Sequence, residues 1–494
     1  MLIQKNFLIR IFISPRTWIP IIHLSFTTGS AFAQTDLWAT AYYAGWMQGQ
    51  YNNGHLPAQE IDFSAMTHIV HFSLVPNPDG TLDALANSIT ETNSSELISR
   101  AHAEGVKVII SIGGWNSGTG FRGASNPLNL VSFVTNLVNF MTTRGYDGID
   151  IDWEPLESSD ATLYIALITA LGTAFNAIQP KPILTAANGG EPEIYSQIHQ
   201  YFDQINLMTY DMSGPWPGWV TWHNSPIYNG GFSFPCCPGN YLPSADGQVD
   251  AFIEEGIPLN KIGIGIDFYG YIWNGGDGTS TGGVSEPRQE WTAEPWMQGN
   301  VPYYTIMEDY FQTQFYHWDD DAKSSYLSID NSGSANDKFI SYDEETAIEA
   351  KFDYARSKGI GGLIIWELGG GYRPNMPQGQ RDLLLQAVKI GIEGGVTGIN
   401  EPTNELPAEF TLEQNYPNPF NPSTTIQFSL TNAAQVELKI YNLLGENVAT
   451  LVNENLNAGL HSVNWDASKE ASGIYLYQLR SGSKVITKKM TLTK

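Results

Sequence analysis

The chain has 494 residues, of which 42% are hydrophobic and 12% aromatic, so it can bury a large core in more than one domain. Its formal net charge is −26. Most of this charge lies in residues 34–404, which hold 15 basic and 43 acidic side chains. A surface this acidic repels phosphate groups. It argues against nucleic acid and anionic membranes as partners and favours a neutral substrate.

The N-terminus has the composition of a secretory signal. Three basic residues precede a mostly apolar run over residues 18–26, and small residues then lead to Ala33. This order predicts a signal peptide over residues 1–33 that is removed after Ala33. A membrane anchor is the alternative, but Pro20 and His23 interrupt the apolar run. No later segment is long and apolar enough to predict a membrane span.

Between Trp38 and Leu368, short apolar runs alternate with longer amphipathic stretches. Strands that are apolar on both faces and separated by helices are typical of parallel βαβ units. Eight such units predict an α/β fold, a closed (β/α)8 TIM barrel with its active site at the C-terminal ends of the strands. The eight runs cover residues 39–46, 67–75, 106–114, 147–154, 183–188, 203–211, 261–270 and 361–368.

The spacing of these runs also predicts the domain boundaries. About ninety residues separate the seventh and eighth runs, and a connection this long usually has structure of its own. We therefore expect a small α+β insertion over about 275–342, within a barrel domain that covers residues 34–392. A linker rich in Gly, Pro, Asn and Glu follows over residues 393–409. Residues 410–494 alternate in short runs separated by turn residues, which predicts a C-terminal all-β sandwich.

The run YDGIDIDWEP places four carboxylates among large apolar residues. Side chains alternate across a strand, so Asp150, Asp152 and Glu154 share one face, while Asp147 has the opposite parity and a structural role. Three adjacent carboxylates in a low-dielectric site cannot all be ionised, and Glu154, nearest the barrel mouth, is placed to donate the retained proton. A site for a divalent cation is the alternative interpretation.

The segment DGIDIDWE resembles the DGxDxDxE signature of glycoside hydrolase family 18, the chitinase family. SIGGW over residues 111–115 is similar to the family's SxGG motif, and LMTYD over residues 207–211 is similar to its MxYD motif. The eighth run ends in the expected tryptophan, Trp366. The resemblance covers about residues 36–392. It departs from the family on the seventh strand, where members commonly read PFYGR and this chain reads DFYGY over residues 267–271.

The resemblance implies a retaining, substrate-assisted hydrolysis of β-1,4 bonds between N-acetylglucosamine units, with no cofactor and no metal ion. Glu154 would be the general acid and base of this reaction. Asp152 would orient the acetamido group of the substrate, and Asp150 behind it would share a proton. Tyr210 would donate a hydrogen bond to the acetamido carbonyl, which attacks the anomeric carbon to give an oxazolinium ion.

The resemblance also implies substrate-binding residues. Trp366 would form the floor of subsite −1, because the apolar face of a sugar packs on an indole ring. Trp115, Asp211 and Met208 are further candidates from the matched motifs. Tyr43 on the first strand is a candidate as well, although packing is its simpler interpretation. Four further tryptophans are expected to extend the cleft, namely Trp216, Trp219, Trp222 and Trp273.

The C-terminal segments NYPNPFNPSTTIQFSL and IYNLLGENVATLV, with the ending KKMTLTK, resemble the C-terminal sorting domain of the type IX secretion system in Bacteroidetes-like bacteria. The resemblance implies that the type IX machinery is a partner. It also implies an extracellular or cell-surface location in a Gram-negative bacterium. A carbohydrate-binding module is the alternative for a small β-sandwich, but the few aromatic residues and the basic tail favour sorting.

The sequence as a whole predicts a secreted, monomeric chitinase that acts on chitin or chitooligosaccharides. One alternative is an endo-β-N-acetylglucosaminidase acting on N-glycans, and another is a non-catalytic chitin-binding lectin on the same barrel. Trp153 and the insertion favour polymeric chitin over N-glycans. The presence of Glu154 argues against the lectin, because such lectins usually lack the terminal acid.

Overall fold

The structure is a computed structural model. It describes residues 37–493 except 49–55, 217, 276–283, 292–295, 331–335, 378, 395–409, 413, 416–417, 457–458 and 483. The predicted signal peptide and most of the predicted linker therefore lie outside the described residues. Within the described part of the chain, no helix is long and apolar enough to cross a membrane.

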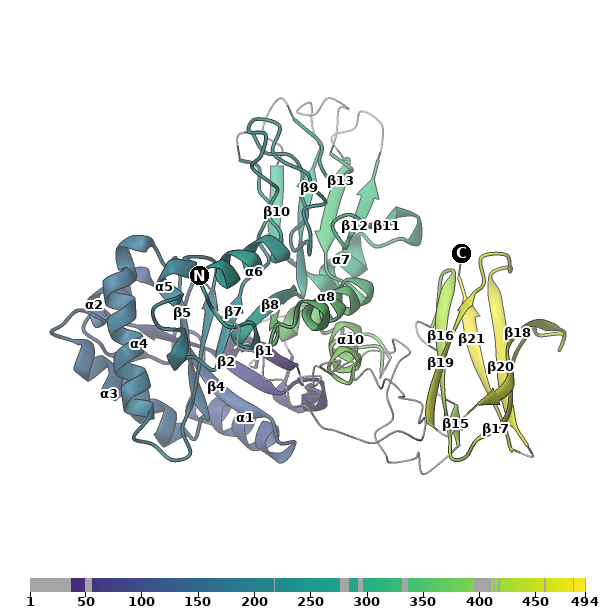
Figure 1. Cartoon of the computed structure of the whole chain (residues 1–494), viewed down its shortest axis with the longest axis horizontal. Coiled ribbons are helices and arrows are strands. Elements are labelled where there is room, and N and C mark those ends of the chain that lie inside the picture. Colours follow the sequence, from purple (N-terminus) through teal and green to yellow (C-terminus); the bar gives the residue numbers. More distant parts are fainter. Residues whose placement is uncertain are drawn as a thin grey trace, which may run out of the picture. The chain divides into compact units, whose positions relative to one another are not determined.

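Eight parallel strands form a closed barrel (Figure 1), and each of them coincides with one of the predicted runs. The strand order is β1-β14-β8-β7-β6-β5-β4-β2, and β1 also pairs with β2, which closes the barrel. The predicted TIM barrel is thus confirmed. The strands are β1 (Trp38–Ala44), β2 (His68–Pro76), β4 (Lys107–Gly114), β5 (Gly148–Trp153), β6 (Ile183–Asn188), β7 (Gln204–Leu207), β8 (Ile262–Asp267) and β14 (Gly362–Trp366).

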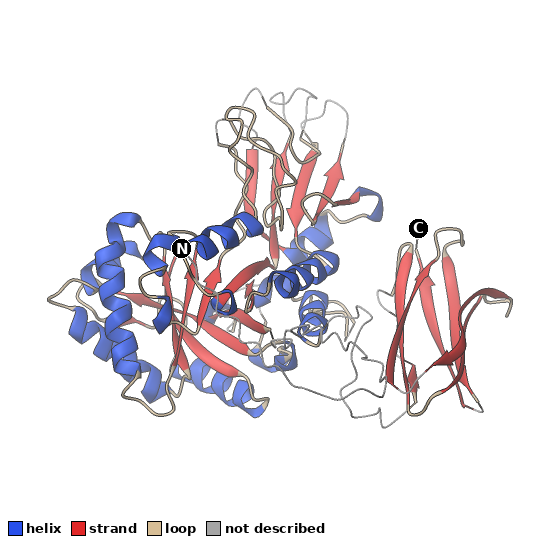
Figure 2. Cartoon of the chain, in the orientation of Figure 1, coloured by secondary structure: helices blue, strands red, loops and turns tan. Residues whose placement is uncertain are grey.

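Helices follow most of these strands and pack outside the barrel (Figure 2). Local sequence sets several of their ends. The Thr90 hydroxyl accepts a hydrogen bond from the Asn93 N–H at the start of α1, and α3 and α8 end at Gly145 and Gly359, both in the left-handed region. The helices are α1 (Glu91–Ala103), α2 (Gly118–Ala124), α3 (Leu130–Arg144), α4 (Ala161–Phe175), α5 (Pro192–Tyr195), α6 (Ala245–Glu254), α8 (Glu345–Lys358), α9 (Leu368–Gly371) and α10 (Leu383–Ile392).

Between β8 and α8 the described residues form an antiparallel five-stranded sheet and one α-helix, which is the predicted α+β insertion. The strand order is β10-β9-β13-β12-β11. The sheet takes its first strand before the predicted start at residue 275, because β8 ends at Asp267 and the chain enters β9 almost at once. The elements are β9 (Tyr269–Asn274), β10 (Trp296–Pro302), α7 (Tyr303–Asp309), β11 (Tyr316–Asp319), β12 (Ser324–Ile329) and β13 (Lys338–Tyr342).

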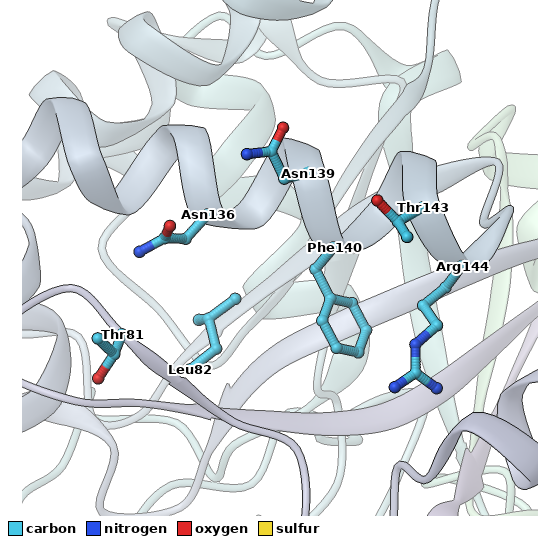
Figure 3. Close-up of a pocket in the computed structure, with 7 residues that line it drawn as sticks. All are labelled: Thr81, Leu82, Asn136, Asn139, Phe140, Thr143 and Arg144. Carbon is cyan, nitrogen blue, oxygen red and sulfur yellow. The ribbon is translucent and has the colours of Figure 1, made fainter.

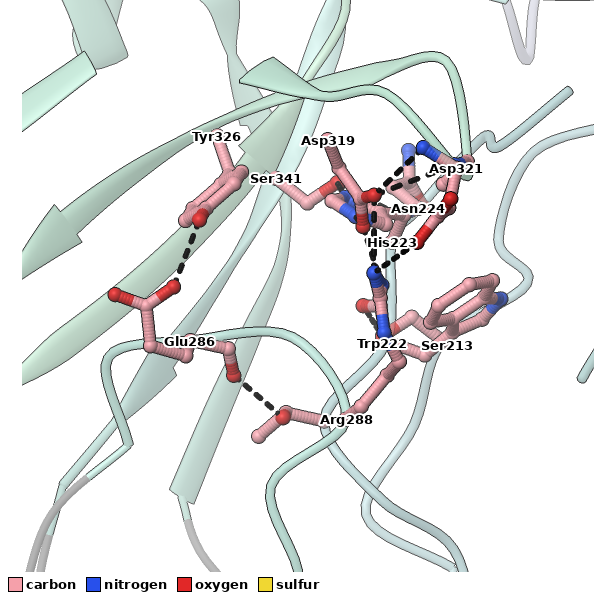
Figure 4. Close-up of polar contacts among 12 residues, drawn as sticks. Ser213, Trp222, His223, Asn224, Glu286, Arg288, Asp319, Asp321, Tyr326 and Ser341 are labelled. Atoms are coloured by element: carbon pink, nitrogen blue, oxygen red, sulfur yellow. Dashed lines mark hydrogen bonds and ion pairs between the residues drawn. The ribbon is translucent and has the colours of Figure 1, made fainter. Parts of the chain in front are cut away.

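A buried polar cluster joins this sheet to the loop after β7 (Figure 4). Oδ2 of Asp319 in β11 is 2.8 Å from Nε2 of His223, and the two terminal guanidinium nitrogens of Arg288 donate to the same carboxylate. Ser341 of β13 lies 3.4 Å from Nδ1 of His223. Burial lowers the pKa of His223, although the Asp319 carboxylate opposes this change. The cluster therefore fixes the loop after β7 on the insertion sheet.

The C-terminal region is a separate all-β fold and confirms the predicted sandwich. One sheet has the order β15-β16-β19 and the other has the order β18-β17-β20-β21. Phe428, Trp465 and Tyr477 are buried in a core of their own. The strands are β15 (Thr411–Leu412), β16 (Ser423–Leu430), β17 (Ala434–Tyr441), β18 (Asn447–Leu456), β19 (Gly459–Asp466), β20 (Gly473–Ser481) and β21 (Lys484–Leu492).

Candidate active site

Side chains alternate between the two faces of β5, and its carboxylates share the face that lines the barrel interior. Ile149 and Ile151 pack in the large core that the helices cover, so Asp150 and Asp152 point into the barrel. Both carboxyl groups are buried, whereas Glu154, just past the end of β5, is half-buried. The acidic face thus runs from the closed interior of the barrel to the C-terminal end of its strands.

Asp150 is the innermost of the three carboxyl groups and is held by neighbouring strands. Ser111 of β4 donates to its Oδ2 at 2.9 Å, and Thr185 of β6 donates to its Oδ1 at 2.7 Å. Burial raises the pKa of Asp150 to about 6, although the hydroxyl groups of Thr185, Ser111 and Tyr42 lower it. Asp150 therefore gains or loses a proton close to neutral pH.

Asp152 and Glu154 form a coupled pair. Burial raises the pKa of Asp152 well above its ordinary value, and the charges of Glu154 and Asp150 add to this shift. Burial also raises the pKa of Glu154, although its hydrogen bond with Asp152 acts in the opposite direction. Oδ1 of Asp152 is buried and has no hydrogen-bond partner among the described residues. The pair therefore retains a proton and has an acceptor atom that is free for a ligand.

The backbone of the SIGG motif explains why two glycines precede Trp115. Gly113 and Gly114 both have positive φ, at 114° and 103°. A Cβ atom on Gly113 would lie 1.9 Å from the carbonyl oxygen of Asp152. Only glycine therefore lets β4 approach β5 this closely beside the carboxylates.

Two contacts hold the segment that carries Glu154. The Ser117 hydroxyl accepts from the N–H of Glu154 at 3.2 Å and lies 3.3 Å from the carbonyl oxygen of Asp152, to which it donates. Arg122 of α2 donates to both carboxylate oxygens of Asp160, at 2.6 and 2.8 Å. The position of Glu154 thus depends on α2 as well as on β5.

Tyr210 and Asp211 follow β7 and reach the same site. Tyr210 is buried in the aromatic cluster inside the barrel. Asp211 has φ of 59° and accepts hydrogen bonds from the hydroxyls of Tyr269 at 2.6 Å and Tyr271 at 2.9 Å. Burial is the main cause of the raised pKa of Glu154, and Asp211 lies close enough for its charge to raise that pKa further. The MxYD motif and the β5 carboxylates therefore share one site.

Aromatic side chains form the apolar part of the site. Trp366, the last residue of β14, is half-buried, and its ring lies 5.7 Å from that of Tyr42 and 4.7 Å from that of Phe72. Met208 packs at the edge of the same cluster. Trp115, directly after the SIGG motif, is 74% exposed. An accessible indole ring, such as that of Trp115, suits the apolar face of a sugar.

A surface hollow is lined by residues other than these carboxyl groups (Figure 3). It has a volume of about 430 Å³ and lies between α3 and the segment that contains β3 (Leu82–Asp83). Its lining includes Arg144 but no carboxylate and none of the predicted site residues. In the described part of the chain, no group of three or more His, Cys, Asp or Glu side chains is arranged to hold a metal ion.

The comparisons with known proteins agree with this geometry. Residues 39–371 match the model of glycosyl hydrolases family 18, which is more than half of the chain. The chain belongs to glycosyl hydrolases family 18. Residues 414–493 match the secretion system C-terminal sorting domain. The chain thus joins a family 18 domain to a sorting domain.

Relatives of this family 18 chain include named chitinases. Chitinase A1 of Niallia circulans is 31% identical over 299 residues, which are 54% of this chain and 40% of that protein. Chitinase 1 of Aphanocladium album is 28% identical over 370 residues, which are 69% of this chain and 82% of that protein. The fold is similar to that of the Ostrinia furnacalis Group IV chitinase in complex with allosamidin. That similarity has a TM-score of 0.61 at 23% identity and covers 73% of this chain and 100% of that chain.

Three sequence-based expectations for this family 18 domain are wrong. Tyr43 is fully buried, and its hydroxyl donates to the carbonyl of Leu56 at 2.5 Å, so Tyr43 packs in the outer core and does not face the site. Trp222 and Trp273 are also fully buried and do not extend the cleft. Their indole N–H groups are bonded to the carbonyl of Pro243 and to the hydroxyl of Ser213. Trp216, by contrast, is 47% exposed.

Sequence reasoning missed the tyrosines that surround the family 18 site. Tyr42 faces the interior because β1 places it, and not Tyr43, on the same side as Thr40. Strand parity separates Tyr42 from Tyr43 but does not say which of them faces inward, because both faces of β1 are buried. Tyr271 occupies the position of the missing arginine and donates to Asp211. No sequence signal predicted that contact, because it joins the insertion sheet to the loop after β7.

Proposed function

We propose that this protein is a secreted chitinase that hydrolyses β-1,4 bonds between N-acetylglucosamine units with retention of configuration. The observation that carries the proposal is the acidic face of β5. Burial raises the pKa values of Asp150, Asp152 and Glu154, and only the last of them reaches the open end of the barrel. That arrangement holds a proton where a glycosidic oxygen can receive it.

In the proposed first step, the protonated Glu154 donates its proton to the glycosidic oxygen, and the bond to the leaving sugar breaks. The carbonyl oxygen of the 2-acetamido group attacks the anomeric carbon of the same sugar and forms a cyclic oxazolinium ion. Asp152 accepts a hydrogen bond from the acetamido N–H through its free Oδ1, which orients the group and stabilises its positive charge.

In the second step, Glu154 removes a proton from a water molecule, which opens the oxazolinium ion and restores the original configuration. Asp150 lies behind Asp152 and takes up a proton when Asp152 ionises. Tyr210 donates its hydroxyl to the acetamido carbonyl, and Trp366 forms the floor beneath the sugar ring. Trp115, Asp211 and Met208 contact neighbouring parts of the substrate.

The experiment that tests this proposal is incubation of the full chain with chitin oligosaccharides and colloidal chitin. We expect release of short oligomers whose first-formed reducing ends are the β-anomer by proton NMR, which reports retention. Glu154→Gln, which cannot donate the proton, should abolish the release. An α-anomeric first product would overturn the mechanism. Turnover of N-glycans without turnover of chitin would assign the alternative substrate, and binding without hydrolysis would assign a lectin.

We further propose that the C-terminal domain directs the chain to the type IX secretion machinery of a Gram-negative bacterium and that the exported enzyme acts as a monomer. The match of residues 414–493 to a sorting domain supports export. Deletion of residues 410–494 should leave an active enzyme inside the cell envelope. Normal export with weakened binding to insoluble chitin would instead identify a carbohydrate-binding module. Light scattering of the exported enzyme checks the monomer.

A further inference from the structure

A closed polar cluster lies behind the loop after β7. Lys351 of α8 donates from its ammonium group to the Ser225 hydroxyl at 2.5 Å, to the Gly265 carbonyl at 2.9 Å, and to the carboxylate of Asp343. Oδ1 of Asp267 lies 3.6 Å from the same nitrogen. The charged side chains of the cluster are 0–1% exposed. A buried charge of this kind is stable only when it is paired and hydrogen-bonded.

Asn224 connects this cluster to the active site. Its amide nitrogen donates to Oδ2 of Asp267 at 2.5 Å, and its amide oxygen accepts from the N–H of Asp211 at 3.0 Å. The backbone carbonyl of Asn224 accepts from the N–H of Met212, also at 3.0 Å. The contacts therefore lead from the cluster to the N–H groups of Asp211 and Met212, which hold the backbone on both sides of the Asp211 side chain.

Ser225 makes a second connection one residue further on. Its hydroxyl receives a hydrogen bond from Lys351 and donates to the carbonyl of Thr209 at 2.6 Å. Tyr210 thus lies between two residues whose backbone is tied to the cluster. Its ring also packs on Gly265, where a Cβ atom would lie 2.5 Å from the ring. The carbonyl of the same Gly265 is a partner of Lys351.

The backbone of this loop needs such support. Asp211 has φ of 59°, in the left-handed region that non-glycine residues rarely occupy, and this conformation costs about 1 kcal/mol or more. A buried ion pair by itself is weak evidence for stability, because apolar residues can often replace it without loss. This cluster differs from an isolated ion pair because its hydrogen bonds lead to backbone groups of Thr209, Asp211 and Met212.

We propose that Lys351, Asp267 and Asn224 are positioning residues that hold Tyr210 and Asp211 in the geometry required for hydrolysis. For its kinetic test the proposal rests on the proposed chitinase function. Asp267 is the link between Lys351 and Asn224, because it lies against the ammonium group of the lysine and accepts a hydrogen bond from the amide of the asparagine.

The first experiment is a double-mutant cycle between residues 267 and 211 in the full chain. Asp267→Ala should lower kcat/KM for chitin oligosaccharides by about tenfold to a hundredfold, mainly through kcat, because it removes the support of the loop. In an Asp211→Asn background the same substitution should lower kcat/KM by less than about threefold. An equal loss in both backgrounds would overturn the proposal, because the effect of Asp267 would then not depend on Asp211.

A second readout does not depend on the substrate. Hydrogen exchange of peptides that contain Thr209–Met212 should be faster in Asp267→Ala than in the wild type, because two N–H groups of the loop lose a fixed acceptor. Leu171→Ala, a fully buried core substitution in α4, is the matched destabilised control and should leave this exchange unchanged. Unchanged exchange in Asp267→Ala, or equally fast exchange in the control, would contradict the proposal.

The conservative variant completes the test. Asp267→Asn keeps the shape of the side chain and supplies an oxygen to Asn224, so it should retain kcat within about threefold of the wild type. A hundredfold loss in Asp267→Asn would count against positioning by hydrogen bonds. If Asp267→Ala does not fold, Asn224→Ala takes its place in the same cycle. If the wild type does not cleave chitin, the proposed function fails, whereas hydrogen exchange still decides the positioning role.

Discussion

Two groups of carboxyl side chains are buried in this barrel, and they differ in what balances their charge. Asp150, Asp152 and Glu154 take part in none of the ion pairs found among the described residues. Asp267 and Asp343 both lie against the ammonium group of Lys351. Burial raises the pKa of Asp267, as it raises the pKa values of the β5 carboxyl groups, so burial alone does not distinguish the two groups.

The two groups also differ in their access to solvent. The Lys351 cluster is closed on all sides. The β5 group opens at Glu154, which is half-buried, and leaves Oδ1 of Asp152 without a partner among the described residues. A balanced, closed group can hold a loop in place, whereas an unbalanced group that reaches solvent keeps a proton it can transfer. Both groups contain several buried acids, and the difference between them is the cation, Lys351, that lies beside only one group.

The largest effect is expected at Lys351, the cation of the closed group. Lys351→Met should reduce the free energy of unfolding by about 3–5 kcal/mol, because Asp343 and Asp267 are left without their cation in a closed site. Urea unfolding measures the loss. Adding Asp343→Asn, which removes one of the unpaired charges, should restore part of it. A single variant as stable as the wild type would show that the lysine does not balance the cluster.

A second prediction concerns Asp150 and pH. Its pKa is raised from 3.8 to about 6 by burial, so its contribution to stability is complete below its unfolded pKa and is lost as the pH rises through about 6. A shift of this size corresponds to about 3 kcal/mol. Between about pH 4 and pH 8, the wild type should therefore lose about 2–3 kcal/mol relative to Asp150→Asn. Urea unfolding at both pH values checks this, and parallel pH profiles would contradict it.

At Asp152 the expected effect is on rate. In the proposed mechanism, Asp152→Asn removes the negative charge that would face the acetamido group, so kcat on chitin oligosaccharides should fall about a hundredfold. Glu157→Gln is the matched control, because Glu157 is an exposed carboxylate in the loop after β5 and should change kcat less than about twofold. Steady-state kinetics measures both variants. Comparable losses in both would indicate that the general acidity of the loop, and not Asp152, controls the rate.

The smallest effect is expected at Tyr271. Tyr271→Phe removes one of the two hydroxyls that donate to Asp211 and leaves Tyr269 in place. A single hydrogen bond of this kind corresponds to about a threefold to tenfold decrease in kcat/KM. Kinetics on oligosaccharides of increasing length checks the decrease. Tyr228→Phe is the control, because the ring of Tyr228 packs on Tyr354 and its hydroxyl is not bonded to Asp211. An equal decrease there would remove the special role of Tyr271.

The sequence by itself determined the barrel and the acidic face. Apolar runs of strand length, separated by amphipathic stretches, allow few arrangements other than parallel βαβ units. Alternation along β5 then places Asp150 and Asp152 inside and Ile149 and Ile151 outside without further information. These features depend on short-range rules, which a sequence contains in full.

Only the tertiary structure decided which aromatic residues face the site and how the loop after β7 is held. The choice between Tyr42 and Tyr43 depends on the register of β1 in the closed barrel, and a shift of one residue exchanges the two faces. The burial of Trp222 and Trp273 depends on packing of the insertion sheet. Lys351 meets Asp267 across 84 positions of the chain, and no local pattern encodes such a contact. Long-range packing, which brings charges of distant segments together, decided these features.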